Sequence, residues 1–297
     1  MRLPVLVAAE PRADAPVAPF LGLTALWIQL TGTWCNLECA HCLNASGPQA
    51  PWLRPLDGAT ARRAIREGEA VGVKEIYFTG GEPFLHREIL ALLGEALAVA
   101  PTTVLTNGTT VDAAVADALA ALSARSAYSL EIRVSLDDTD AERNDLIRGR
   151  GAWAKAVAAI RLLDGRGLLP IVTATEIVSG EHPTGRGTYE RFRDFLLSLG
   201  IRRPRVKIMP IFALGRLAQP GGRQLSEAML EGFDRARLQC ADSRVVADGR
   251  VYACPILAGL PGAQLSDGDL RESFTPASLY HPACVTCYET GMTCRNG

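Results

Sequence analysis

The stretch Trp34-Cys35-Asn36-Leu37-Glu38-Cys39-Ala40-His41-Cys42 places three cysteines on one short segment. An apolar run that predicts a β-strand, Ala25 to Leu30, comes just before it. Three thiolates on one loop can ligate three irons of a cubane iron-sulfur cluster, and without a fourth protein ligand one iron stays open to another molecule. A zinc knuckle and a set of buried free thiols are the alternatives, but zinc sites usually combine one cysteine pair with a second ligand pair. The segment therefore predicts a cluster with one reactive iron.

A second motif, Gly80-Gly81-Glu82-Pro83, follows the next predicted strand. A CxxxCxxC loop after a first strand, together with this turn, resembles the radical S-adenosylmethionine (SAM) superfamily, and the resemblance covers most of the chain. It implies a 4Fe-4S cluster held by Cys35, Cys39 and Cys42, with SAM bound to the open iron. It also implies that one electron splits the sulfonium of SAM, and that the resulting 5'-deoxyadenosyl radical removes a hydrogen atom from a substrate.

Composition excludes several classes of protein. The 297 residues suffice for one large or two unequal domains. Because 31 basic residues balance 32 acidic ones, neither nucleic acid nor an anionic membrane is expected as a partner. No apolar run approaches the roughly 18 to 20 residues of a spanning helix, and the stretch from Met1 to Phe20 lacks the apolar core of a signal peptide. The grouped cysteines suit metal ligands in a reducing compartment better than disulfides, so we expect a cytoplasmic protein.

Strand-like and helix-like stretches alternate along the chain, which is typical of parallel β/α units. Six units are predicted, with strands at Ala25 to Leu30, Glu75 to Thr79, Thr102 to Leu105, Leu130 to Leu136, Ile171 to Ile177 and Arg205 to Ile211. Helices are predicted between them, for example from Gly58 to Val71, with Asp57 as N-cap, and from Trp153 to Leu163. The expected fold class is α/β, a partial (β/α)6 radical SAM barrel.

The fourth predicted strand has one polar and one apolar face. Its polar face carries Glu131, Arg133, Ser135 and Asp137, and its apolar face carries Leu130, Ile132, Val134 and Leu136. Since a fully packed barrel interior would be apolar, we expect a barrel whose outer face packs on helices and whose inner face lines a polar cavity. An antiparallel sheet with one solvated face is the alternative.

The candidate motifs follow the strands in order. The cysteine loop follows the first strand, Gly80-Gly81-Glu82-Pro83 the second and Thr106-Asn107-Gly108 the third, while Ser135 and Asp137 close the fourth. Because β/α barrels carry their chemistry on loops at the carboxyl ends of the strands, these motifs are expected to meet at one end of the barrel.

The resemblance also implies individual contacts to SAM. The Gly-Gly turn and the Glu82 region would meet the amino group of SAM, Ser135 and Asp137 its ribose, and Arg148 its carboxylate. His41 occupies a position where relatives usually carry an aromatic residue beside the adenine. Structural turn glycines, a capping aspartate and a solvated arginine are the alternatives. The full predicted set is His41, Gly80, Gly81, Glu82, Asn107, Ser135, Asp137 and Arg148.

The C-terminal part follows Gly215-Arg216, which is similar to a Gly-Arg pair that ends the barrel in radical SAM relatives. It contains five more cysteines: Cys240, Cys254, Cys284, Cys287 and Cys294. Asp248-Gly249 predicts a type I′ hairpin whose outer ends carry Cys240 and Cys254. This pattern resembles the SPASM and twitch extensions of radical SAM enzymes. The resemblance implies an auxiliary 4Fe-4S cluster with Cys240, Cys254, Cys284 and Cys287 as ligands, and a zinc site is the alternative. Cys294 could replace one of these ligands, stay inert or donate a hydrogen atom to a substrate radical.

These observations give an expected organisation and function. We expect an N-terminal arm (1–23), a barrel (24–218) and a twitch-like cluster domain (219–297). The predicted activity is a radical SAM oxidoreductase or epimerase acting on a small natural-product or cofactor precursor, with flavodoxin or ferredoxin as reductant. A maturase or epimerase of a ribosomally synthesised peptide is an alternative, but since only 24 residues precede Ala25, we expect no leader-binding domain ahead of the barrel. An iron-sulfur electron carrier and a zinc-stabilised binding protein are alternatives from other classes.

Overall fold

A computed structural model describes residues 12–49, 52–176, 187–219 and 221–291. Its main feature is a curved nine-stranded sheet with the order β10-β9-β8-β2-β3-β4-β5-β6-β7. Neighbouring strands from β2 to β7 pair in parallel. They are β2 (Ala25–Gln29), β3 (Glu75–Thr79), β4 (Thr102–Thr106), β5 (Leu130–Ser135), β6 (Ile171–Glu176) and β7 (Arg205–Pro210). All six predicted strands are present, and the antiparallel alternative is wrong.

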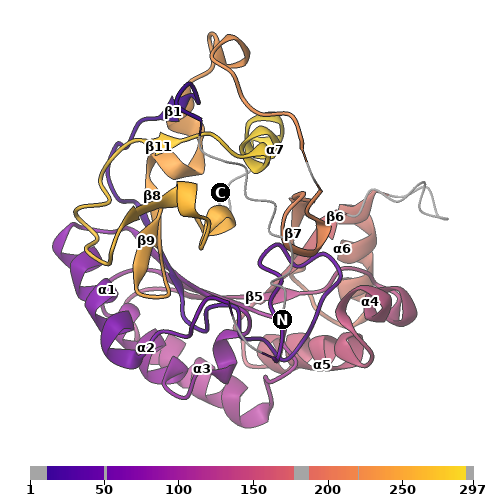
Figure 1. The fold of residues 1–297 in the computed structure, drawn as a ribbon. Helices are drawn as coiled ribbons and strands as arrows, with labels where there is room; N and C mark the ends of the chain where they lie inside the picture. The colour runs from indigo at the N-terminus through magenta and orange to yellow at the C-terminus, as the bar shows by residue number, and fades with distance from the viewer. Residues whose placement is uncertain (1–11, 50–51, 177–186, 220, 292–297) are drawn as a thin grey trace.

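Helices cover the outside of this sheet and leave its inner face to the interior (Figure 1). They are α1 (Gly58–Ala70), α2 (Ile89–Ala96), α3 (Ala113–Arg125), α4 (Ala141–Arg148), α5 (Ala152–Asp164) and α6 (Thr188–Ser198). Aspartates begin three of them: the side chain of Asp57 accepts a hydrogen bond from the backbone N–H of Thr60 (2.7 Å), and Asp112 and Asp140 cap α3 and α4 in the same way.

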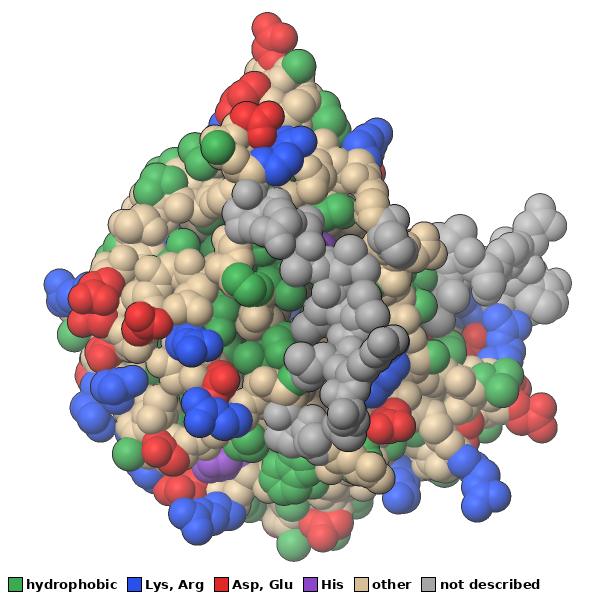
Figure 2. Space-filling view, viewed as in Figure 1, with side chains coloured by type: hydrophobic (Ala, Val, Ile, Leu, Met, Phe, Trp, Pro, Cys, Tyr) green, Lys and Arg blue, Asp and Glu red, His purple; other side chains and the backbone are tan. Residues whose placement is uncertain are grey.

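The polar and apolar side chains of β5 lie on opposite faces of the strand, as the alternating pattern predicts. Leu130, Ile132 and Val134 are buried in the core between sheet and helices, whereas Arg133 and Ser135 face the interior. Part of the interior is nevertheless apolar. Trp27 stacks on Tyr77 (ring centroids 4.1 Å apart), and both pack against the C-terminal part of the chain. Figure 2 shows charged side chains mainly on the outer rim of this face, and hydrophobic side chains farther in.

The predicted C-terminal hairpin extends the barrel sheet. It consists of β8 (Ser243–Ala247) and β9 (Arg250–Tyr252), and Asp248 and Gly249 have φ angles of 48° and 75°, as a type I′ turn requires. Strand β8 pairs in parallel with β2, with Ser243 opposite Ala25. The sequence does not predict this pairing, because it joins segments more than 200 residues apart in the chain.

The remaining elements lie around this hairpin. They are β10 (Gln264–Ser266), which pairs with β9, β1 (Val17–Ala18), which pairs with β11 (Ala277–Ser278), and α7 (Pro282–Thr290). Short 3-10 turns complete the described elements: η1 (Pro83–Leu85), η2 (Gly215–Leu217), η3 (Ala228–Leu230), η4 (Arg235–Arg237), η5 (Gln239–Ala241), η6 (Pro255–Leu257) and η7 (Pro261–Ala263). None of the described helices combines the length and the apolarity that crossing a membrane requires.

Candidate functional site

A cavity of about 250 Å³ opens at the carboxyl ends of the parallel strands. Most of the predicted site residues lie on its wall, in agreement with the order of the motifs along the chain. Those that line it are Cys35, Cys39, His41, Cys42, Gly80, Gly81, Asn107, Ser135 and Arg148. Glu82 and Asp137 are not among the lining residues, and both are buried behind it.

The cysteine loop is held from a distant part of the chain. Arg216 donates from Nη1 to the carbonyl oxygen of Cys39 (2.9 Å) and from Nη2 to that of Ser46 (2.6 Å). Gly215 has a φ of 58°, and a Cβ at this position would lie 2.2 Å from the carbonyl oxygen of Cys42. The Gly-Arg pair, predicted only as the end of the barrel, therefore clamps the loop that carries the three cysteines.

The Gly-Gly turn allows two loops to touch. A Cβ on Gly81 would lie 2.0 Å from the carbonyl oxygen of Trp34 and 2.8 Å from Cβ of Cys35. The backbone N–H of Glu82 donates to the same Trp34 carbonyl (3.0 Å). The turn after β3 therefore packs directly against the cysteine loop, and any side chain at position 81 would push the two loops apart.

The Glu82 carboxylate is directed into the protein. It accepts hydrogen bonds from the hydroxyl of Thr106 (2.7 Å), the backbone N–H of Asn107 (2.7 Å) and the N–H of Phe84 (3.1 Å). Burial raises the pKa of Glu82 to about 7, and these hydrogen bonds partly counter the rise. The carboxylate therefore connects the loop after β3 to the loop after β4. Glu82 does not line the cavity itself, but Asn107, to which it is bonded, does.

Asn107 also connects Glu82 to the first cysteine, Cys35. Its side-chain amide donates to Oδ1 of Asn36 (2.9 Å) and lies 3.7 Å from the sulfur of Cys35. Burial raises the pKa of the Cys35 thiol to about 12, and the pKa of Cys39 is raised for the same reason. Since a metal ligand must be a thiolate, loading of this site would release protons from both residues.

Asp137 joins two of the predicted SAM contacts. Its carboxylate lies 2.6 Å from Nε2 of His41 and 2.6 Å from Nε of Arg148, and it accepts a bond from the backbone N–H of Thr175 (2.9 Å). Although burial opposes its ionisation, the Arg148 charge and the bond to His41 hold the pKa of Asp137 well below its usual range. Asp137 therefore fixes the positions of His41 and Arg148, a role that the sequence does not reveal.

Arg148 stands between this carboxylate and the cysteine loop. Its Nη1 atom lies 4.0 Å from the sulfur of Cys39, and its side chain is 9% exposed. A guanidinium on the cavity wall beside three thiols fits the carboxylate of SAM at the open iron of a cluster. The donor set and the cavity therefore fit the predicted cluster and cofactor.

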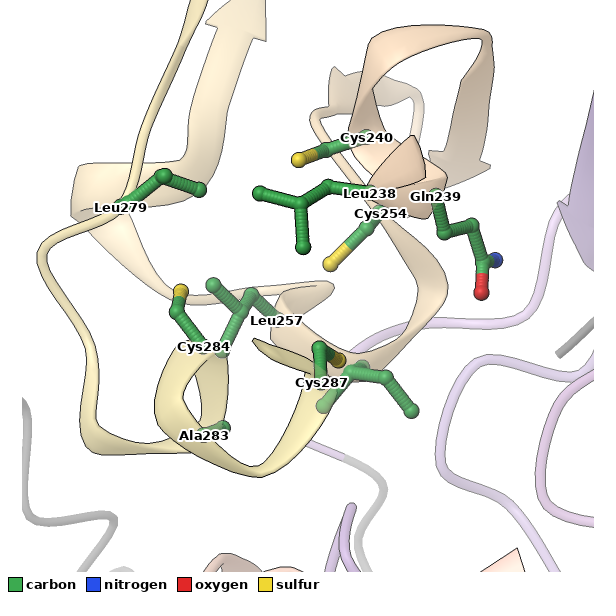
Figure 3. Close-up of a pocket in the computed structure, with 10 residues that line it drawn as sticks. Leu238, Gln239, Cys240, Cys254, Leu257, Leu279, Ala283, Cys284 and Cys287 are labelled. Atoms are coloured by element: carbon green, nitrogen blue, oxygen red, sulfur yellow. The ribbon is translucent and has the colours of Figure 1, made fainter. Parts of the chain in front are cut away.

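The C-terminal cysteines gather around a second, apolar pocket (Figure 3). Cys240 and Cys254 lie at the two ends of the β8–β9 hairpin, while Cys284 and Cys287 lie one turn apart on α7. Apolar side chains surround them, among them Leu238, Leu257 and Leu279. All seven described cysteines have free thiols, and Cys294 lies outside the described residues.

The four thiols Cys240, Cys254, Cys284 and Cys287 all border the same pocket. In the described part of the chain, no three His, Cys, Asp or Glu side chains converge closely enough to hold a single metal ion. A zinc ion needs four ligands converging on one centre, whereas in a cubane each thiolate binds its own iron. Burial raises the pKa of Cys284 to about 12, and that of Cys240 and Cys254 is also raised. This set of four cysteine donors fits a 4Fe-4S cluster.

A short turn separates the two sites. Ile256, in η6 directly after Cys254, borders both the large cavity and the cysteine pocket. Pro255 also lines the large cavity. A single hydrophobic residue at this position has no distinguishing signal in the sequence, so only the structure identifies it as the shared wall.

Comparison with known proteins gives agreeing results. The family model described as the radical SAM superfamily matches residues 30–193. Mycofactocin maturase MftC of Mycolicibacterium smegmatis is 30% identical over 310 residues, covering 89% of this chain and 75% of MftC. The fold is similar to that of Streptococcus suis SuiB bound to SAM, with a TM-score of 0.65 and 16% identity over 87% of this chain and 67% of SuiB. SuiB bound to its precursor peptide SuiA gives a TM-score of 0.64 at 16% identity, over 87% of this chain and 66% of SuiB.

The family match covers more than half of the chain and includes the cysteine loop, the Gly-Gly turn and Arg148. The similarity to MftC extends over 89% of the chain. The chain belongs to the radical SAM superfamily, and its cofactors are SAM, a SAM-binding 4Fe-4S cluster and an auxiliary 4Fe-4S cluster, as the sequence predicts.

Proposed function

We propose that this chain is a peptide maturase that oxidises one residue of a ribosomally synthesised peptide. When bound, the first cluster and SAM supply a 5'-deoxyadenosyl radical. The radical would take a hydrogen atom from a carbon of the peptide, giving 5'-deoxyadenosine. The peptide radical would then lose one electron to the auxiliary cluster and one proton to solvent, so that the peptide is oxidised by two electrons in total. A flavodoxin or ferredoxin would supply the electron that starts the reaction.

The similarity to mycofactocin maturases carries this proposal, because it extends over 89% of the chain. The likeness to SuiB, which has been solved with its precursor peptide, supports it at the level of the fold. The sequence alone favours a small molecule, but these relatives favour a peptide substrate. They do not favour an electron carrier, which would need no cavity beside its cluster.

The residues around the cavity have separate proposed roles. Cys35, Cys39 and Cys42 would hold the first cluster, and Arg148 would bind the carboxylate of SAM. Ser135 and Asn107 remain predicted contacts to the cofactor. Apolar side chains on the remaining wall would receive the peptide side chain: Trp27, Leu105, Met209, Phe212 and Ile256.

Oxidation is preferred over epimerisation because of the C-terminal pocket. Epimerisation needs a thiol that returns a hydrogen atom to the substrate radical, and the candidate for that role, Cys294, lies outside the described residues. Cys240, Cys254, Cys284 and Cys287 all border the same apolar pocket, where four thiols form a complete ligand set for an electron acceptor.

The test uses the anaerobically reconstituted chain with SAM, a chemical reductant and a short peptide encoded next to its gene. We expect 5'-deoxyadenosine and a peptide product lighter by two hydrogen atoms or by a larger oxidative loss, both measured by mass spectrometry. Deuterium placed on the attacked carbon should appear in 5'-deoxyadenosine. Formation of 5'-deoxyadenosine with every such peptide unchanged, and with deuterium transferred from a sugar or amino acid instead, would contradict the peptide assignment.

A further inference from the structure

Arg244, on strand β8, is a cation sealed inside the protein. Its side chain is 0% exposed. The guanidinium donates hydrogen bonds to four backbone carbonyl oxygens: those of Cys240 (2.9 Å), Ser243 (2.7 Å), Ser273 (2.8 Å) and Thr275 (2.6 Å). The ring of Phe20 covers one face, with its centroid 3.9 Å from the guanidinium carbon.

None of these partners carries a negative charge. In the part of the chain that the structure describes, no Asp or Glu side chain pairs with Arg244. Carbonyl groups satisfy the hydrogen-bonding capacity of a guanidinium, but they do not cancel its charge. A buried ion without a counter-ion is strongly destabilising. An arginine in this position therefore calls for a nearby anion.

The apolar cysteine pocket can supply that anion once its thiols bind a cluster. Nη1 of Arg244 is bonded to the carbonyl oxygen of Cys240, whose side chain borders the pocket. Four protonated thiols would be neutral and would leave the guanidinium uncompensated. Four thiolates around an iron-sulfur core give a net negative site, and reduction of the cluster makes it more negative still.

We propose that Arg244 is the counter-charge of the auxiliary cluster and raises its reduction potential enough for it to accept an electron from the substrate radical. This inference rests on the proposed function, since it needs an auxiliary cluster that takes up an electron. In a buried, apolar site a nearby cation stabilises the reduced state more than the oxidised state, because the interaction grows with the added negative charge. Arg244 thereby acts as a positioning and tuning residue without touching the substrate.

The experiment uses the full chain with Cys35, Cys39 and Cys42 changed to Ala, so that only the auxiliary cluster is observed. The midpoint potential is measured by an EPR-monitored redox titration in this background and in the same background with Arg244→Met or Arg244→Lys. We expect a clear shift to more negative potential for Arg244→Met, and a smaller shift for Arg244→Lys, which keeps the charge. Arg250→Met, on the neighbouring strand with a side chain 51% exposed, is the matched control and should leave the potential unchanged.

Equal potentials for Arg244→Met, Arg244→Lys and the parent protein would overturn the proposal. Thermal unfolding of the cluster-loaded and cluster-free proteins gives a second readout, since the counter-charge is needed only when the cluster is present. Arg244→Met should therefore lower the Tm of the loaded protein more than that of the cluster-free protein. Equal losses in both forms would show a purely structural residue and would also overturn it. If the parent background shows no cluster signal at all, the assignment of the auxiliary ligands fails together with the proposal.

Discussion

The two cysteine sites use the same ligand atoms in opposite surroundings. The N-terminal loop presents three thiols to an open cavity, next to the charged Arg148 and the polar Asn107. The C-terminal pocket surrounds four thiols with leucine side chains. A missing ligand beside charged groups suits a cluster that binds SAM, whereas a complete set in an apolar pocket suits one that only exchanges electrons. The number of thiols and their surroundings together distinguish the two proposed roles.

The strongest test of this comparison removes the N-terminal site. Changing Cys35, Cys39 and Cys42 together to Ala should abolish cleavage of SAM, because the open iron is lost. Iron and sulfide should fall by about half, since the auxiliary cluster stays. Chromatographic assay of 5'-deoxyadenosine and iron analysis measure the two effects. Continued cleavage in the triple variant would place SAM at the other site.

The reciprocal change removes one thiol of the C-terminal pocket. Cys284→Ala should lose the auxiliary cluster and abolish formation of the oxidised peptide, because the substrate radical has no electron acceptor. Production of 5'-deoxyadenosine should continue without coupling to product. Iron content, 5'-deoxyadenosine and peptide mass are measured on the same sample. A variant that keeps both full iron content and product would exclude Cys284 as a ligand.

Local patterns explain why most of the fold could be predicted. Strand alternation and the Asp57 cap depend on residues a few positions apart, and both are found in the structure. The Asp248-Gly249 turn is local in the same sense, since it needs only two residues that tolerate positive φ.

Contacts between distant segments could not be predicted in this way. Arg216 lies 177 residues from the Cys39 carbonyl that it binds, and Asp137 lies 96 residues from His41. The pairing of β8 with β2, which brings the C-terminal cysteines beside the barrel, is also long-range. The resemblance to a family therefore supplies the identity of candidate site residues, but the structure is needed to show which of them act through another residue.

Asp137→Asn tests the polar side of the comparison. The change leaves Arg148 buried without its carboxylate, and breaking a buried ion pair costs about 3–5 kcal/mol of folding stability. The affinity for SAM should fall as well, because His41 and Arg148 are no longer held in place. Denaturant unfolding and calorimetric titration with SAM measure the two losses.

The matched control for Asp137→Asn breaks an exposed pair. Asp117→Asn separates Asp117, whose side chain is 68% exposed, from Arg166, and should leave both the folding stability and the SAM affinity nearly unchanged. If the two substitutions changed folding stability and SAM affinity equally, Asp137 would have no specific role in positioning His41 and Arg148.

The smallest effect is expected at Ile256, the wall between the two sites. Ile256→Val removes one methylene from a buried side chain and should cost about 0.5–1.5 kcal/mol of stability. Because Ile256 borders both pockets, the gap should also reduce the yield of oxidised peptide per 5'-deoxyadenosine. Ile160→Val, on the buried face of α5, removes the same group from a residue that lines neither pocket and controls for stability alone. If both variants keep the parental yield, the wall does not take part in the coupling, and the two sites exchange the electron by another route.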